Sequence, residues 1–158
     1  MRDVGSDKDE DEMTDKHMTT VSQHYFVDES DKPSFSIAII ENMKEEYGLF
    51  VWPCSVILAE YVWQQRYRFS GANVVELGAG TSLPGLVAAK VGSNVTLTDD
   101  SNRIEVLKNM RRVCEMNKLN CRLLMTSLPP SHICSRVLQD QSSLRLIIIE
   151  VGIILLSS

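Results

Sequence analysis

The chain has 158 residues, of which 44% are hydrophobic, and a formal net charge of −5 at pH 7. This length and composition predict one globular domain, and an acidic chain with no basic stripe is a poor candidate for direct binding of nucleic acid. The apolar stretch over residues 144–156 is interrupted by Glu150 and Gly152 and is short for a bilayer span. We therefore expect neither nucleic acid nor a membrane among its partners.

Residues 1–22 are expected to form a disordered acidic tail. They hold many charged and polar side chains and few large apolar ones, so they cannot bury enough surface to offset the entropy of ordering. A solvated leader is the simpler interpretation of this charge run, and an interaction tail is the alternative. The acidic composition suits neither a signal peptide nor a transit peptide.

The four cysteines indicate a reducing compartment rather than a disulfide scaffold. Because no secretory signal accompanies them, we expect free thiols and a location in the cytosol, the nucleus or both. The sequence contains no C-x-x-C pair, so no metal site is predicted.

A β-hairpin followed by a helix is predicted ahead of the central part of the chain. HYFV and FSIAII are rich in β-formers and are separated by the turn-prone DESDKPS. A helix then begins at Pro53, and Trp52, Val56, Ala59 and Trp63 fall on one of its faces. Core packing accounts for the last three, whereas the ring of Trp52, at the helix entry, can cover either the core or a ligand.

Strands and helices then alternate along the chain. The predicted strands are NVVEL, SNVTLTD, NCRLLM and LRLIIIEV, and the predicted helices are LPGLVAAK and residues 103–117, the latter capped by Ser101 or Asn102. This alternation predicts an α/β fold with a Rossmann-like, doubly wound and mostly parallel sheet, preceded by the hairpin and the first helix.

The segment VVELGAGTSLPGL predicts a ligand site at the end of a strand. Gly78 and Gly80 permit a tight turn and close approach of a ligand to the backbone. Asp99 follows the strand end by about 20 residues, a distance at which an acid commonly binds ribose hydroxyls. Thr81 or Ser82 is expected to cap the following helix. A turn that only closes a βα unit is the simpler alternative.

The residues around the turn favour S-adenosylmethionine (SAM) over NAD. A third glycine of a dinucleotide motif would fall at Leu83, Gly85 comes two residues late, and Pro84 lacks an N–H where a pyrophosphate would collect donors. SAM carries no phosphate and has a positive sulfonium. Glu76 places negative charge beside the turn, which suits a cationic cofactor.

VVELGAGTSLPGL resembles motif I of the seven-stranded SAM-dependent methyltransferases. Together with VWPCSVILAEYVW upstream and V-x-L-T-D downstream, it is similar to methyltransferase family 16 over residues 35–122. The resemblance implies that residues 23–122 are the N-terminal part of a methyltransferase domain with SAM as its cofactor. It also implies a protein substrate, such as a histone or a chaperone-like protein, that is methylated on lysine or arginine.

The same resemblance implies cofactor-binding roles for six residues: Trp52, Glu76, Gly78, Ala79, Gly80 and Asp99. Trp52 would pack along the cofactor, the residues from Glu76 to Gly80 would form the loop on its methionine side, and Asp99 would hold the ribose hydroxyls. No catalytic residue is identified.

The resemblance ends near residue 123. The family continues with Leu-Thr-Trp-Gly or Leu-Asp-Trp-Gly, whereas this chain has RLLMTSLPPSH. The family then has an Asp-x-x-Tyr or Asp-x-Phe-Tyr element, whereas IIIEVGII offers Glu150 with Ile153 three residues on. We therefore expect residues 123–158 to be a divergent tail of a truncated form, incomplete at its C-terminus, with weak or no turnover. The alternatives are a non-catalytic interaction or regulatory protein with a partial Rossmann-like fold and, less favoured, an NAD-dependent oxidoreductase.

Overall fold

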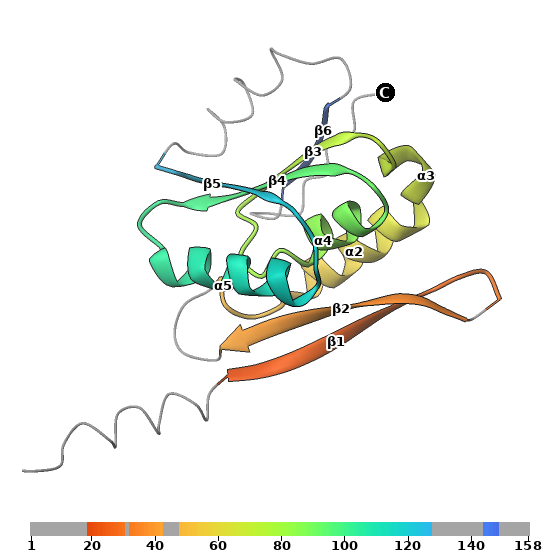
Figure 1. The fold of residues 1–158 in the computed structure, drawn as a ribbon, viewed down its shortest axis with the longest axis horizontal. Coiled ribbons are helices and arrows are strands. Elements are labelled where there is room, and N and C mark those ends of the chain that lie inside the picture. Colours follow the sequence, from red (N-terminus) through yellow and green to blue (C-terminus); the bar gives the residue numbers. More distant parts are fainter. Residues whose placement is uncertain (1–18, 31, 43–47, 128–143, 149–158) are drawn as a thin grey trace, which may run out of the picture.

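The computed structural model describes residues 19–30, 32–42, 48–127 and, for the backbone only, 144–148. Figure 1 shows three layers: a parallel sheet, a layer that contains helices α2, α4 and α5, and an antiparallel hairpin on the far side of these helices. Helix α4 contacts both the sheet and the hairpin, and so does α5. The predicted α/β architecture with a preceding hairpin and helix is confirmed.

The parallel sheet has four strands in the order β5-β4-β3-β6. Strands β3 (Asn73–Leu77), β4 (Asn94–Asp100) and β5 (Arg122–Thr126) run outward from the centre, and β6 (Leu144–Ile148) returns to the other side of β3. The strand order therefore reverses direction at β3, as in doubly wound sheets. In such sheets, ligands bind beyond the carboxyl end of the strands at this switch point.

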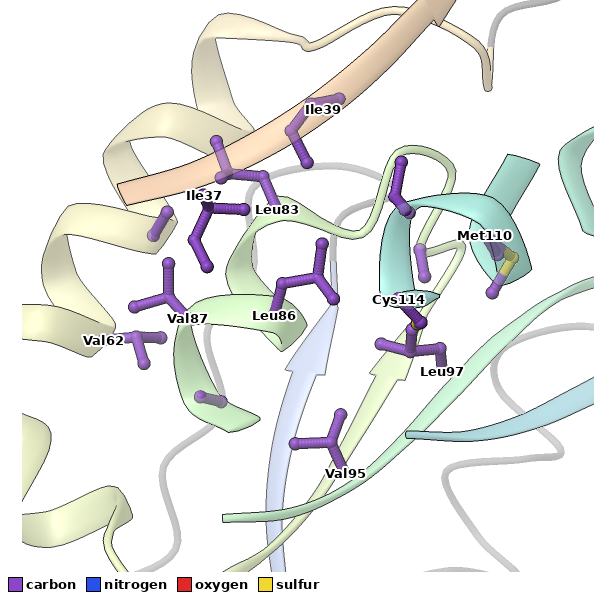
Figure 2. Packing of buried hydrophobic residues seen from close by; sticks show 14 of the residues in the cluster. Ile37, Ile39, Val62, Leu83, Leu86, Val87, Val95, Leu97, Met110 and Cys114 are labelled. Atoms are coloured by element: carbon purple, nitrogen blue, oxygen red, sulfur yellow. The ribbon is translucent and has the colours of Figure 1, made fainter. Parts of the chain in front are cut away.

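Helix α4 (Leu83–Lys90) is the centre of the hydrophobic core, which explains its uninterrupted run of small and apolar residues. Figure 2 shows Leu83, Leu86 and Val87 of α4 between Ile37 of β2 and the side chains of the sheet. All four side chains are fully buried. Burial of each side chain stabilises the fold by roughly 1.5–3 kcal/mol. The contacts of this helix therefore hold the hairpin and the sheet together.

The hairpin consists of β1 (Thr19–Val27) and β2 (Pro33–Asn42), paired from Thr19↔Asn42 onward. The predicted end of the disordered tail at residue 22 is therefore wrong, because residues 19–22 already belong to β1. Most side chains of β1 are exposed or half-buried. Its order comes from the backbone ladder with β2 rather than from burial, and a burial argument could not anticipate this.

Asparagine side chains of α5 (Ile104–Met116) and its C-cap hold the free edge of β2. The Asn109 Nδ2 group donates to the Ile40 carbonyl (2.9 Å). The Ala38 N–H donates to Asn117 Oδ1 (2.8 Å), and Asn117 Nδ2 donates back to the Ala38 carbonyl (2.7 Å). The Asn117 amide thus replaces the backbone of a neighbouring strand, and the buried edge of β2 keeps its hydrogen bonds.

The other end of the hairpin packs on α2 (Pro53–Gln64), which is followed by the short α3 (Arg66–Phe69). The ring of Trp63 lies edge-on to Phe35, with ring centroids 5.1 Å apart, and its indole N–H donates to the Val27 carbonyl (2.6 Å). A buried indole needs such a partner, so this contact fixes the hairpin tip to the helix.

Two local predictions about the helices are wrong. Val56 is 43% exposed, because the buried stripe of α2 runs through Ser55, Leu58 and Val62, one helical position away. Neither Ser101 nor Asn102 caps α5, whose N-cap position is Arg103 without a side-chain cap. Asn102 instead donates its backbone N–H and its side-chain amide to Asp100 Oδ1, at 2.9 and 3.0 Å.

Other expectations lie outside the described residues. These are the disorder of residues 1–18, the role of Glu150, and the divergent tail apart from β5, β6 and residue 127. Within the described ranges, every helix is too short or too polar to cross a membrane.

Candidate cofactor site

The turn between β3 and α4 requires glycine at two positions. Gly78 has φ 61° and Gly80 has φ 50°, both in the left-handed region that side chains disfavour. A Cβ on Gly80 would also lie 3.2 Å from the carbonyl oxygen of Gly48, which precedes α2. The predicted tight turn is confirmed, and the structure adds that it packs closely against the segment before α2.

Hydrogen bonds with the neighbouring strand hold this turn in place. The Ala79 N–H donates to the Thr98 carbonyl of β4 (2.9 Å), and the Gly80 N–H donates to Asp99 Oδ2 (2.9 Å). The Thr98 hydroxyl donates in return to the Glu76 carbonyl (2.9 Å). The N–H groups of Ala79 and Gly80 are therefore already used within the chain and are not free for a phosphate.

The N-terminus of α4 is closed to phosphate as well. Pro84 has no N–H, and the Gly85 N–H donates to Glu76 Oε2 (2.8 Å). A dinucleotide site needs free N–H groups and uncompensated positive potential at this point. Here the carboxylate of Glu76 already accepts the Gly85 N–H that a phosphate would need. The use of these N–H groups within the chain supports the sequence argument, from Leu83 and Pro84, that NAD does not fit this turn.

Glu76 itself does not lie at the surface of the turn, as negative charge beside a ligand suggested; it is fully buried, with 0% exposure. Its Oε1 atom has no hydrogen-bond partner among the described residues. Burial raises the pKa of the Glu76 carboxyl well above its usual range, the Gly85 N–H opposes the shift, and the charge of Asp99 adds to it. The side chain is thus an internal cap of α4 with one unused acceptor.

The buried acid explains why position 85 has no room for a side chain, a relation that sequence reasoning missed. A Cβ on Gly85 would collide with Glu76 Oε2 and with a methyl group of Leu97. Counted along a dinucleotide motif, Gly85 is only a glycine in the wrong place. The pairing of a strand acid with a glycine in the first turn of the next helix was the signal that could have revealed it.

The expected side-chain cap of α4 is wrong. Ser82 occupies the N-cap position with φ 65°, but it makes no capping hydrogen bond to the helix, and its hydroxyl is 3.5 Å from the Gly80 carbonyl. Thr81 is buried beside it. The acceptor for the first turn comes from β3, across the turn, instead of from the residue before the helix.

Asp99 lies at the carboxyl end of β4, beside the glycine turn, where a ribose acceptor is expected. Its Oδ2 atom accepts from Gly80, and its Oδ1 atom accepts from the Asp100 N–H (2.8 Å). The Arg103 guanidinium is 3.5 Å from Oδ1, and the Asp99 side chain is 3% exposed. The ribose role of Asp99 stays a prediction, and its carboxylate is covered in this structure.

Trp52 stands apart from the hydrophobic core. It is the N-cap of α2, it is 39% exposed, and its ring centroid is 4.6 Å from that of Phe50. The place of Trp52 along a cofactor stays a prediction, and Phe50 is an aromatic neighbour that the sequence did not single out. Among the described residues, no three His, Cys, Asp or Glu side chains are placed to hold a metal ion.

Known proteins with similar sequences are methyltransferases. The chain is 43% identical over 89 residues to histone-arginine methyltransferase METTL23 of Xenopus laevis, which covers 56% of this chain and 38% of that protein. It is 49% identical over 74 residues to METTL23 of Mus musculus, with 47% and 29% covered. Protein N-lysine methyltransferase METTL21A of Mus musculus is 44% identical over 59 residues, with 37% and 27% covered. The matched segment is about a third of the length of these relatives.

A solved structure shares the fold. The Thermus thermophilus 16S rRNA N2 G1207 methyltransferase RsmC, in complex with AdoMet and guanosine, matches with a TM-score of 0.56 at 16% identity, over 85% of this chain and 34% of that one. A family model described as lysine methyltransferase matches residues 31–149, well over half of the sequence. The chain therefore belongs to the lysine methyltransferase family that its glycine turn resembles.

Proposed function

We propose that this chain binds SAM at the β3–α4 turn, as the cofactor-binding part of a protein methyltransferase. The observation that carries the proposal is the use of the N–H groups around the turn. Ala79, Gly80 and Gly85 donate them to acceptors of the chain itself. A turn of this kind keeps the glycine geometry of a nucleotide site and has lost the phosphate cradle, which fits a cofactor with an adenosine and no phosphate.

The side chains around the turn fit SAM chemically. Glu76 has a buried oxygen without a partner, and Asp99 adds a second carboxylate at the adjacent strand end. A carboxylate and an unpartnered carboxyl oxygen suit a ligand with a sulfonium and an ammonium group. The half-buried Phe50 and the exposed Trp52 form an aromatic pair that can offer a ring face to a cation or a base.

SAM supplies the electrophilic methyl group, and the protein's task is to orient it toward the acceptor. In this chain, the glycine turn would hold the methionine side and Asp99 the ribose. Both are carried by neighbouring strands of one sheet, bonded from Thr98 to Glu76. Rigid placement of this kind is the main source of rate in a transfer that depends on in-line geometry.

We propose a lysine or arginine side chain of a protein as the methyl acceptor. Support comes from relatives named histone-arginine and protein N-lysine methyltransferases. A histone is the first substrate to test and a chaperone-like protein the second. The thiols of Cys54, Cys114 and Cys121 are free, which agrees with the proposed cytosolic or nuclear location.

Thermal unfolding of the purified chain with added ligand tests the cofactor assignment. A ligand at 100 times its Kd stabilises the folded state by about 2.7 kcal/mol. We expect SAM and S-adenosylhomocysteine to raise the melting temperature and NAD to leave it unchanged. A shift with NAD, or no shift with either sulfur ligand, would overturn the assignment.

We further propose that this chain alone transfers methyl groups weakly. The segment that follows β5 has the sequence SLPPSH instead of the tryptophan-containing segment of the family. A non-catalytic interaction or regulatory role is the second candidate, favoured by the same SLPPSH segment. Robust incorporation of radioactive methyl into histones or lysate proteins would contradict weak transfer.

A further inference from the structure

The carboxylate of Asp99 is enclosed although it stands at the open end of the sheet. Its side chain is 3% exposed. Two backbone N–H groups, those of Gly80 and Asp100, hold its oxygens at 2.9 and 2.8 Å. A ribose hydroxyl can reach this carboxylate only if a group that now covers it moves away.

The guanidinium of Arg103 is the cover that can move. Its Nη1 atom is 3.5 Å from Asp99 Oδ1, longer than either backbone contact. The Arg103 side chain is itself 32% exposed, so it can swing into solvent. The backbone donors, in contrast, belong to the glycine turn and to β4 and cannot leave without disrupting them.

The fold makes room for Arg103 in this closed position. A Cβ on Gly48 would lie 2.7 Å from Arg103 Nη2 and 2.9 Å from a methyl group of Val106. The guanidinium therefore lies directly on the Gly48 backbone, and Gly80 packs against the same residue from the turn side. Three separate segments meet over Asp99, and only one contributes a flexible side chain.

Helix stability does not explain the position of Arg103. It occupies the N-cap of α5 and makes no side-chain capping bond. A cation at the start of a helix opposes the helix dipole, and Ser, Asp or Asn is preferred there. The interaction that Arg103 makes instead is its ion pair with Asp99, and a residue that breaks a local rule points to a functional constraint.

We propose that Arg103 gates the ribose side of the cofactor site. It covers Asp99 and leaves it when ribose hydroxyls take its place on Oδ1. The proposal rests on the proposed function, because it takes Asp99 as the ribose acceptor. A gate lowers the apparent affinity by the fraction of molecules that are open, so Arg103 sets how readily the cofactor enters.

Stopped-flow and calorimetric binding of SAM to the full chain test the gate. Arg103→Ala is expected to increase both the association rate and the affinity by up to about fivefold, the factor that corresponds to a partly exposed ion pair. Arg103→Lys keeps the charge without the planar group on Gly48 and is expected to fall in between. Lys108→Ala, which removes a surface pair with Glu105 on the same helix, is the matched control and should bind like wild type.

Amide hydrogen exchange of the cofactor-free proteins gives an independent readout. Exchange at Gly80 and Asp100 should accelerate in Arg103→Ala and not in Lys108→Ala, because water then reaches the carboxylate that both amides bind. Unchanged exchange, or SAM binding that is equal or weaker in Arg103→Ala, would overturn the gate. Absence of SAM binding in all proteins, with accelerated exchange in Arg103→Ala, would instead refute the cofactor assignment, leaving Arg103 as a cover without a ribose role.

Discussion

The β3–α4 turn and the β1–β2 hairpin both depend on side chains that bond to distant backbone groups. At the turn, the carboxylates of Glu76 and Asp99 accept hydrogen bonds from the N–H groups of Gly85 and Gly80. At the hairpin, the amides of Asn109 and Asn117 bond to the edge of β2. An amide offers a donor and an acceptor without charge, whereas a buried carboxylate carries a desolvation cost that one or two N–H groups offset only in part.

The hairpin and the turn differ in what their buried polar side chains contribute. The hairpin uses the chemistry that a fold would use to satisfy backbone groups at low cost. The turn uses a fully buried acid with an unpartnered oxygen, Glu76, which a stable fold alone would not require. We propose that this acid is retained for a cationic ligand. Substitutions in the two regions should therefore separate in their effects on unfolding and on SAM binding.

The largest change in the free energy of unfolding is expected for Gly85→Ala. An alanine inside a helix ordinarily stabilises it by roughly 0.5–1 kcal/mol relative to glycine. Here its methyl group meets Glu76 and Leu97, so we expect a loss of about 3 kcal/mol, as for overpacked cores. Denaturant unfolding of the wild-type protein and of Gly85→Ala measures this difference in the free energy of unfolding.

A double-mutant cycle identifies the cause of that loss. If the collision with the carboxylate is responsible, Gly85→Ala should cost much less in a Glu76→Ala background. An equal cost in both backgrounds would show that Glu76 is not the obstacle.

Asn117→Ala is expected to cost about 2 kcal/mol, because it leaves the N–H and carbonyl of Ala38 unpaired at the buried edge of β2. The affinity of the folded fraction for SAM should not change, since the hairpin does not form the turn. Asn120→Ala, at an exposed position of the following loop, is the control. A loss of SAM affinity in Asn117→Ala would show that the two regions are not separable.

Glu76→Gln is expected to stabilise the protein at neutral pH and to weaken SAM binding. Because burial raises the pKa of Glu76, its protonated form favours folding. That contribution is complete below the unfolded-state pKa, near 4.3, and is lost as the pH rises through the folded-state pKa. Glutamine stays neutral and can still accept from Gly85.

The gain from Glu76→Gln should be present at pH 7, where burial opposes the ionised carboxyl, and should vanish near pH 4. Urea unfolding of both proteins from pH 4 to 8 measures this difference. Parallel pH profiles for the two proteins would contradict a raised pKa at this site.

The smallest effect on unfolding is expected for Trp52→Ala. The ring is 39% exposed and lies outside the core, so the stability should change by less than about 0.5 kcal/mol. If the indole packs along the cofactor, SAM affinity should fall about tenfold, within the range of an aromatic contact. Tyr67→Ala, at a more exposed aromatic residue of α3, should alter neither quantity.

Much of the fold could be predicted because its signals are local. Strands, helices and the left-handed Gly78 and Gly80 follow from periodicity and from residues next to each other in the sequence. The errors arise where backbone pairing or neighbouring elements decide, as at Thr19, where a strand edge orders polar residues. At Val56, the buried stripe depended on where α4 lies.

The position of the site could be predicted from the sequence, but the side-chain contacts within it could not. The sequence places an acid before the turn, but only the packing of α4 on the sheet brings the Glu76 side chain against Gly85. The contact of Arg103 with Asp99 and Gly48 joins three segments far apart in the sequence. This contact of Arg103 depends on tertiary packing, which no local pattern encodes.

Titration of isotope-labelled chain with SAM and with NAD, followed by amide NMR, tests the central claim most directly. We expect SAM to shift the resonances of Gly78, Gly80 and Asp100 and of the Trp52 indole. Resonances of the hairpin edge should stay in place, and NAD should cause no shift at the turn. Shifts at the turn with NAD, or an unaffected turn at saturating SAM, would contradict the account.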